Sequence, residues 1–175
     1  MPLVESKNEI KFHGYFPGVI GMITEAHAAY YHEQWGFDVS FETQVGRELS
    51  EFMDDFQEGR DGIWVATVGN RFAGSAAMDG RQASTEGARL RWFIVVPALQ
   101  GAGLGKELLA RAVAFCRQRN YPRAYLWTFL GLDAARALYE REGFRLCEEH
   151  VVDQWGQNIT EQRFELDLPG REQDA

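Results

Sequence analysis

The chain has 175 residues, of which 45% are hydrophobic, 13% aromatic and 25% charged, and its formal net charge is −8. This length and apolar share fit one domain with a sizeable core and exclude a disordered chain. The acidic balance disfavours nucleic-acid binding. The longest apolar run, residues 92–96, is too short to span a membrane, and residues 1–11 lack the apolar stretch of a secretory signal. We therefore expect a cytoplasmic protein without nucleic-acid or membrane partners.

The two cysteines, Cys116 and Cys147, are too few for a disulfide framework, and they lack the close spacing of zinc ligands. Both are expected to remain reduced, as in most cytosolic proteins. The sequence thus predicts no metal site.

The first half of the chain predicts two helices followed by a β-hairpin. Residues 19–35 follow a turn signal and keep their apolar side chains on one helical face. Residues 41–56 repeat the same helical spacing. Residues 62–68 and 72–78 are rich in strand-forming side chains, and Gly69-Asn70 between them is typical of a tight hairpin turn.

The second half predicts a strand, a helix, a strand, a helix and two final strands. Their bounds are, in order, residues 89–96, 105–118, 124–128, 134–142, 144–152 and 160–168. Asp133 is expected to cap the second of these helices, Gly143 to end it, and residues 155–158 to form the last turn. The apolar run 92–96 is typical of a strand covered on both faces. This order of elements predicts the α/β class, with helices packed on one mixed sheet.

A glycine-rich loop joins the strand at 89–96 to the following helix. Its residues are Gln100, Gly101, Ala102, Gly103, Leu104, Gly105 and Lys106. Glycine lets the backbone approach a ligand closely, and the free N–H groups at a helix start favour a phosphate. The glycine spacing matches neither the dinucleotide fingerprint nor the Walker loop. The loop therefore indicates an anionic ligand, with a plain tight turn as the alternative.

Two motifs in this region resemble those of the GNAT superfamily of N-acetyltransferases. Gln100, Gly103 and Gly105 match its acetyl-CoA loop, which reads Gln or Arg, two residues, Gly, one residue, Gly or Ala. Residues 135–144 match a second signature, Ala-x-x-Leu-Tyr-x-x-x-Gly-Phe. Residues 27–37 also look like the acetyltransferase domains often fused to MarR-type regulators. The resemblance covers roughly residues 12–168, the expected core of one acetyltransferase domain spanning residues 1–175.

The resemblance implies a mostly antiparallel sheet whose central strands splay apart, with acetyl-CoA as the cosubstrate. The pantetheine arm would lie along the backbone of Ile94, Val95 and Val96, and the pyrophosphate on the glycine loop. The implied loop contacts are Gln100, Gly101, Ala102, Gly103, Leu104, Gly105 and Lys106. One departure lies at residues 129–132, where many relatives carry an asparagine and this chain reads Phe-Leu-Gly-Leu.

The resemblance also implies direct attack of an amine on the acetyl thioester, with Tyr139 as the general acid that protonates the leaving thiolate. The alternative for Tyr139 is packing against the sheet. Glu86 is a candidate general base, and its alternative is a solvated loop carboxylate. His27 shares a helix face with apolar residues, which favours a hydrogen-bonded core histidine.

The acceptor implied by the resemblance is a small primary amine, such as an amino acid or an amine metabolite. Tyr31, Trp35 and Trp155 are predicted to wall its site, because aromatic walls suit apolar or cationic ligands. Two alternatives stay open, a protein or peptide acetyltransferase and a CoA-binding sensor without turnover. Exposed late strands often pair in this family, so a homodimer is a further expectation.

Two arginines of the strand at 89–96 need anionic partners. Arg89 and Arg91 alternate onto one face of that strand, and a lone buried charge is costly. Asp79 and Glu86 are candidates for a structural ion pair. The alternative is a carboxylate on the substrate, for which Arg91 is the predicted ligand-binding residue.

Overall fold

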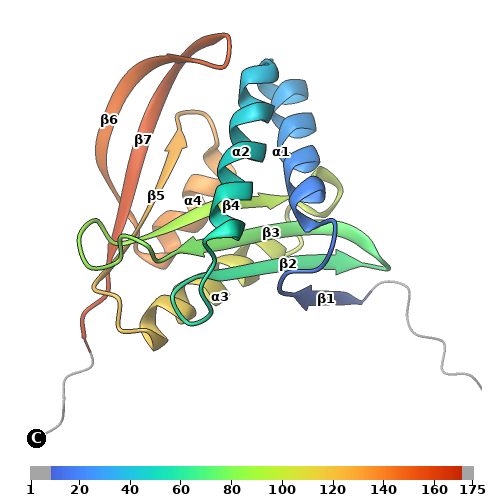
Figure 1. Cartoon of the computed structure of the whole chain (residues 1–175). Helices are drawn as coiled ribbons and strands as arrows, with labels where there is room; N and C mark the ends of the chain where they lie inside the picture. The colour runs from blue at the N-terminus through green and yellow to red at the C-terminus, as the bar shows by residue number, and fades with distance from the viewer. Residues whose placement is uncertain (1–8, 171–175) are drawn as a thin grey trace, which may run out of the picture.

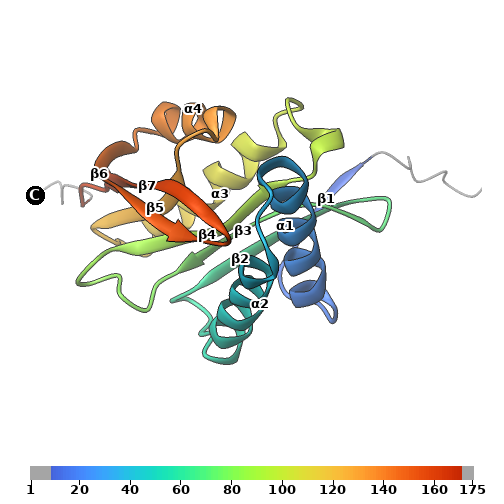
Figure 2. The same cartoon turned by 90° about the horizontal axis from the view of Figure 1, so that it is seen from above.

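The computed structural model describes residues 9–170 as a seven-stranded sheet with two helices packed on each face (Figure 1, Figure 2). The strands lie in the order β1-β2-β3-β4-β5-β7-β6, and every neighbouring pair is antiparallel except β4 and β5. The predicted α/β class with a mostly antiparallel sheet is confirmed. Residues 1–8 and 171–175 lie outside the described part of the chain. The first of these ranges holds most of the segment that was expected to lack a secretory signal.

The elements follow the predicted order after one additional strand at the start. The helices are α1 (Val19–Trp35), α2 (Val39–Asp54), α3 (Leu104–Gln118) and α4 (Asp133–Glu142), with a 3-10 turn at Pro97–Leu99. The strands are β1 (Ile10–His13), β2 (Gly62–Val68), β3 (Arg71–Asp79), β4 (Ala88–Val95), β5 (Arg123–Phe129), β6 (Arg145–Gln154) and β7 (Gln157–Asp167). Within residues 9–170, no helix combines the length and apolar character needed to cross a membrane.

Most differences from the predicted bounds have a local cause. Helix α2 starts earlier than predicted because the Asp38 side chain caps it and accepts from the Ser40 amide at 2.9 Å. The predicted cap of α4 is wrong: Leu132 is the capping residue, and Asp133 lies inside the first turn, where the helix dipole favours its charge. The last turn is shorter than predicted, because Trp155 and Gly156 both adopt left-handed angles and close a two-residue hairpin.

Strand β1 was not predicted, because four edge residues carry too little periodic signal. Only its pairing with β2, which places Ile10 opposite Val68 and His13 opposite Val65, defines it as a strand. The hairpin turn at Gly69-Asn70 is confirmed, with φ angles of 52° and 65°. Left-handed angles at both positions match the right-handed twist of the flanking strands.

Separate apolar cores cover the two faces of the sheet. On one face, side chains of α3 and α4, such as Leu108 and Tyr139, pack with Leu90 of β4. On the other face, side chains of α1 and α2, such as Ile23 and Phe52, pack with Trp92 of the same strand. Strand β4 is therefore buried from both sides, as the apolar run at 92–96 predicted.

A β-bulge interrupts β4 at its centre. Ser75 pairs with Ile94 and Ala77 with Arg91, so Trp92 and Phe93 together oppose one residue of β3. Trp92 adopts a left-handed φ of 46°, and its carbonyl accepts a hydrogen bond of 2.7 Å from the buried Ser75 hydroxyl. The extra residue inverts the alternation of side chains, so that Trp92 packs in the α1 and α2 core while Phe93 packs in the other.

Strands β4 and β5 separate directly before this bulge. They pair only at three positions, from Ala88 opposite Ala124 to Leu90 opposite Leu126. Beyond that point β4 stays paired with β3 as far as Val95, and β5 stays paired with β7 as far as Phe129. The expected splayed strand pair is thus present, and its two arms are held by their outer neighbours.

The bulge predicts a stability effect for Ser75. The change Ser75→Ala removes the donor to the Trp92 carbonyl and leaves that buried acceptor unpaired, which should lower the free energy of unfolding by about 1–3 kcal/mol. Urea denaturation measures the loss. The matched control is Ser50→Ala, which removes an exposed hydroxyl bonded to Gly46 within α2 and should change the free energy by less than about 0.5 kcal/mol. Equal losses in both variants would contradict this account of the bulge.

Candidate functional site

A cavity of about 590 Å³ occupies the space between the separated arms of β4 and β5. Its walls come from α1, α2, β4, the glycine loop, β5, α4 and the hairpin of β6 and β7. It extends from Gln100, Gly101 and Gly105 at the glycine loop to Trp35 and Trp155 at the opposite rim. One continuous space therefore joins the predicted cofactor loop to the predicted acceptor walls.

The glycine loop presents backbone N–H groups at the start of α3. Gly101 and Gly103 have φ angles of 84° and 87°, and a Cβ added to either would meet no atom within 4 Å. Glycine is needed there for the backbone angle, because a side chain would be strained even in open space. Gly103 caps α3 without a side-chain bond, so the N–H groups of its first turn have no helical acceptor. With exposed Lys106 beside them, they suit an anion.

The predicted cofactor residues divide into two sets. Ile94, Val95, Gln100, Gly101 and Gly105 line the cavity, whereas Val96, Ala102, Gly103, Leu104 and Lys106 do not. The Val96 amide donates to the Ala73 carbonyl at 2.9 Å, so it is already used within the sheet. Successive backbone groups of a strand point to opposite sides, so those of Val95 point toward the gap. The Gln100 side chain donates to the Val95 carbonyl at 3.0 Å and ties the loop to β4.

Tyr139 lies on α4 between the sheet and the cavity. The residue is 6% exposed, and its ring packs against those of Phe93 and Phe144 at centroid distances of 5.8 Å and 6.2 Å. It also lines the cavity, so packing and a role in the site are compatible. Burial, with a smaller contribution from Tyr31, raises the pKa of Tyr139 well above that of a free phenol. The hydroxyl therefore remains protonated and able to donate at neutral pH.

The three predicted aromatic residues of the acceptor site all line the cavity. Tyr31 stacks on Phe37, and Trp155 donates from its indole nitrogen to the Gln44 side chain at 2.9 Å. Trp35 lies against Gly131, where an added Cβ would come within 2.4 Å of the indole ring. This glycine belongs to the Phe-Leu-Gly-Leu segment that replaces the expected asparagine, so that segment supports the Trp35 wall.

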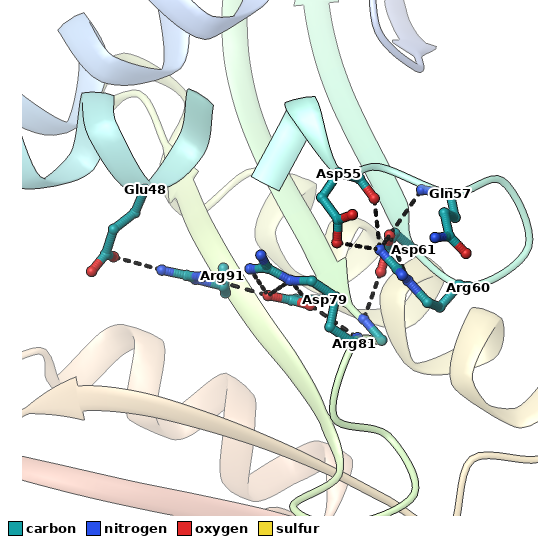
Figure 3. A network of polar contacts seen from close by, with 9 residues as sticks. Glu48, Asp55, Gln57, Arg60, Asp61, Asp79, Arg81 and Arg91 are labelled. Carbon is teal, nitrogen blue, oxygen red and sulfur yellow. Dashed lines mark hydrogen bonds and ion pairs between the residues drawn. The ribbon is translucent and has the colours of Figure 1, made fainter. Parts of the chain in front are cut away.

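Arg91 is held by two carboxylates. Its guanidinium lies 2.5 Å from Glu48 of α2 and 3.5 Å from Asp79 of β3, and its side chain is 10% exposed (Figure 3). The guanidinium also lies 4.3 Å from the centroid of the Trp92 ring. Of the two interpretations drawn from the sequence, the structural ion pair with Asp79 is therefore the one observed.

Glu86 lies outside the cavity. It follows β3 in an exposed turn, its side chain is 58% exposed, and it accepts a hydrogen bond from Arg163 of β7 at 3.2 Å. It does not belong to the cavity walls. The geometry matches the solvated loop carboxylate that was the alternative to a general base.

Sequence reasoning missed three carboxylates that line the cavity, namely Glu48, Glu161 and Asp133, the last of which was expected only to cap a helix. Glu48 lies one helical turn after Gln44, which also lines the cavity, beside the buried stripe that contains Val45. A polar pair four residues apart at the edge of an apolar stripe is a signal that could have identified it. Glu161 faces His150 of β6 at 3.0 Å, and this contact depends on strand register.

His27 also lines the cavity, and the structure confirms it as a hydrogen-bonded core histidine. Its Nδ1 lies 2.8 Å from the Ile23 carbonyl, which can only accept, so Nδ1 carries the proton. Burial lowers the pKa of His27 from 6.5 to about 4, and the bond to Ile23 opposes that shift. The imidazole is thus neutral at physiological pH.

The lowered pKa of His27 predicts a pH-dependent stability. Between pH 6.5 and 4, the unfolded chain binds a proton that the folded chain does not, so the stabilisation present above pH 6.5 is lost as the pH falls. The loss at His27 should be on the order of 3 kcal/mol and absent in His27→Leu. Urea denaturation across this pH range measures it, with an NMR titration of the His27 ring alongside. A ring midpoint near 6.5 would contradict the prediction.

Comparisons with known proteins agree with this geometry. Residues 22–144 match the family model of the acetyltransferase (GNAT) family. An uncharacterized N-acetyltransferase of Escherichia coli, YjgM, is 29% identical over 112 residues, which cover 62% of this chain and 64% of that relative.

Two solved structures share the fold over almost their whole length. Salmonella typhimurium yncA, solved with its cofactor acetyl-CoA, has a TM-score of 0.70 at 16% identity and covers 96% of this chain and 98% of its own. A ribosomal-protein-alanine N-acetyltransferase from Brucella melitensis has a TM-score of 0.71 at 16% identity, covering 90% and 99%. The splayed strands, the glycine loop and the family match over most of the chain together show that this protein belongs to the GNAT family of acetyltransferases.

Proposed function

We propose that the protein is an acetyl-CoA-dependent N-acetyltransferase whose acceptor is a small primary amine. The observation that carries this proposal is the single cavity that connects the glycine loop to Tyr139 and to an aromatic rim. An anionic cosubstrate can bind at one end of this space and an amine can enter at the other. Family membership and the acetyl-CoA bound to a protein of the same fold support the choice of cosubstrate.

The cosubstrate would bind in two parts. Its pyrophosphate would meet the N–H groups between Gly101 and Lys106, where the helix dipole and the lysine charge are favourable. Its pantetheine arm would lie between β4 and β5 and use the outward-facing N–H of Val95, whose carbonyl already accepts from Gln100. Because β4 has no partner strand on this side beyond Leu90, the arm would take the place of the missing neighbour.

The reaction requires the transfer of the acetyl group and several proton transfers, and residues of this site can serve them. The amine nitrogen attacks the thioester carbon, the new C–N bond forms, and the C–S bond breaks. A backbone N–H on the open arm of β4 would stabilise the charge that develops on the thioester oxygen. Tyr139 would donate its proton to the leaving thiolate, and the phenolate would regain a proton from the attacking nitrogen, which must lose one to become the amide. The ammonium proton would leave before attack, to water or to a carboxylate of the cavity, Glu48, Asp133 or Glu161.

A small acceptor is favoured over a protein segment by the shape of the rim. Trp35 and Trp155 come from α1 and from the turn between β6 and β7, and both line the cavity. The Trp155 indole is fixed by Gln44, and the Trp35 carbonyl accepts from Gln157. The Trp35 indole packs against the Phe129 ring at a centroid distance of 5.1 Å, so both indoles are held in place and would leave less room for a peptide chain.

Tyr139→Phe tests the chemical step. Removing the hydroxyl should lower kcat by about 100-fold, because general-acid catalysis contributes about this much, while the KM for acetyl-CoA stays within about two-fold. Thiol release from acetyl-CoA with pooled amino acids, polyamines and short peptides measures both constants. Tyr15→Phe, which changes an exposed residue that does not belong to the cavity walls, should match the wild type. If Tyr139→Phe retains full kcat, another group protonates the thiolate.

Gly103→Ala tests the cosubstrate loop. A Cβ at a φ of 87° strains the backbone and would shift the N–H groups that would meet the pyrophosphate, so the KM for acetyl-CoA should rise at least about ten-fold. The control Gly14→Ala also places a Cβ in open space, at a position without a left-handed angle, and should leave this KM unchanged. An unchanged KM for acetyl-CoA in Gly103→Ala would show that the loop does not contribute to cosubstrate binding.

A further inference from the structure

A second cavity of about 250 Å³ lies beside the first, on the face of the sheet that carries α1 and α2. Its walls are Asp79, Arg81, Gln82, Arg89, Arg91 and Tyr125. Arg89 and Arg91 line both cavities, so these two side chains form the boundary between them. Three of the six wall residues are arginines, and one is an acid.

The carboxylates near this boundary are already engaged by other arginines. Asp79 accepts from Arg81 at 2.6 Å and lies 3.5 Å from Arg91 (Figure 3). Glu48 pairs with Arg91 at 2.5 Å. The chain therefore supplies fewer negative charges at this boundary than its arginines require.

Arg89 is the arginine that remains without a partner. Within residues 9–170, its side chain makes no hydrogen bond or ion pair, and its Nε is the single fully buried side-chain nitrogen or oxygen atom left unbonded. The other arginines of the described residues that lack a hydrogen bond or ion pair are surface-exposed, as Arg47 on α2 is. A buried guanidinium nitrogen without a hydrogen-bond partner is costly, so an anion from outside the chain would be stabilised beside Arg89.

The surplus of positive charge also affects the pKa of Arg91, the neighbouring arginine. Burial lowers the pKa of Arg91, the nearby charge of Arg89 lowers it further, and Glu48 and Asp79 oppose both effects. Two guanidinium groups thus repel each other at the boundary. An anion placed beside Arg89 would relieve that repulsion and satisfy the free Nε.

The position of Arg89 relates this site to the reaction. Arg89 pairs with Tyr125 one residue before β4 and β5 separate. It therefore lies at the end of the gap where the two strands are still paired. Its side chain shares a face with that of Arg91, toward α2 and away from the α3 core. The acceptor rim, built from α1 and the last hairpin, lies on that same face.

We propose that Arg89 binds a carboxylate of the acceptor, so that the substrate class is amines that carry a carboxylate. The proposal rests on the proposed acetyltransferase function and narrows its acceptor. A guanidinium fork matches the two oxygens of a carboxylate, and burial strengthens that contact. Arg91, already paired with Glu48, supports the wall and does not bind the substrate directly.

The test compares each carboxylate with its uncharged isostere. Glycine, β-alanine and γ-aminobutyrate are offered as acceptors alongside glycinamide, β-alaninamide and γ-aminobutyramide, and thiol release from acetyl-CoA is measured. For at least one chain length, the carboxylate should be preferred at least about ten-fold in kcat/KM, mainly through KM, because a charge-assisted contact of this kind is worth a factor of ten or more.

Variants then assign that preference to Arg89. Arg89→Gln should reduce the preference to about one, Arg89→Lys should keep part of it, and the matched control Arg47→Gln should keep all of it. Because the Arg89 charge has no partner in the chain, Arg89→Gln should also leave the midpoint of thermal unfolding unchanged or raised. A purely structural arginine would lower that midpoint without changing the preference ratio.

A binding measurement separates this proposal from the acetyltransferase function. Calorimetric titration of the three carboxylates into protein saturated with CoA should show binding that weakens at least about ten-fold in Arg89→Gln. Such binding without thiol release from any amine would overturn the enzymatic proposal and keep the carboxylate site. Equal use of carboxylates and amides, a preference that persists in Arg89→Gln, or binding by none of the three carboxylates would each overturn the site.

Discussion

The bulge at Trp92 and Phe93 is the constraint on which the rest of the site depends. A regular β4 would continue beside β5, and no wedge would exist between them. One extra residue in β4 bends the strand and increases its twist, and the pairing with β5 is absent beyond Leu90. The Ser75 hydroxyl satisfies the carbonyl that the irregularity frees, so the distortion is compatible with a buried position. The bulge also turns Phe93 toward Tyr139, and thereby fixes the ring that lines the cavity.

The part of β4 that precedes the bulge carries buried charged groups. Arg91 joins α2 to the sheet through Glu48 and to β3 through Asp79, so the helix that forms one cavity wall is fixed relative to the cavity floor (Figure 3). Ion pairs in such places add little net stability, because desolvation offsets their attraction, but they specify one arrangement over others. The same network uses the available acids, and this is why Arg89 is left with an unbonded nitrogen.

Burial has two effects on Tyr139. Packing against Phe93 and Phe144 fixes the ring, and loss of solvent raises the pKa of the phenol. A raised pKa makes the phenol a weaker acid. A thiolate in the same cavity would also lose its solvation, however, and would become a stronger base. Burial acts in this direction on the thiol of Cys116, whose pKa it raises to about 12. Donor and acceptor would therefore shift in the same direction, and proton transfer between them stays feasible.

Local patterns in the sequence determined the bounds of α1, the turn at Gly69-Asn70, the glycine loop and the position of Tyr139 on a short helix. Each depends on residues within a few positions of one another, because helix periodicity, turn angles and caps are local properties of the backbone. The partners of charged side chains were decided by the tertiary structure. Glu48 lies 43 positions from Arg91 and reaches it only because α2 packs over β4, and Glu86 lies on Arg163 because β7 returns beside β5. Which arginine keeps an unpaired charge depends on every acid that the fold brings near it, and no window of the sequence contains that information.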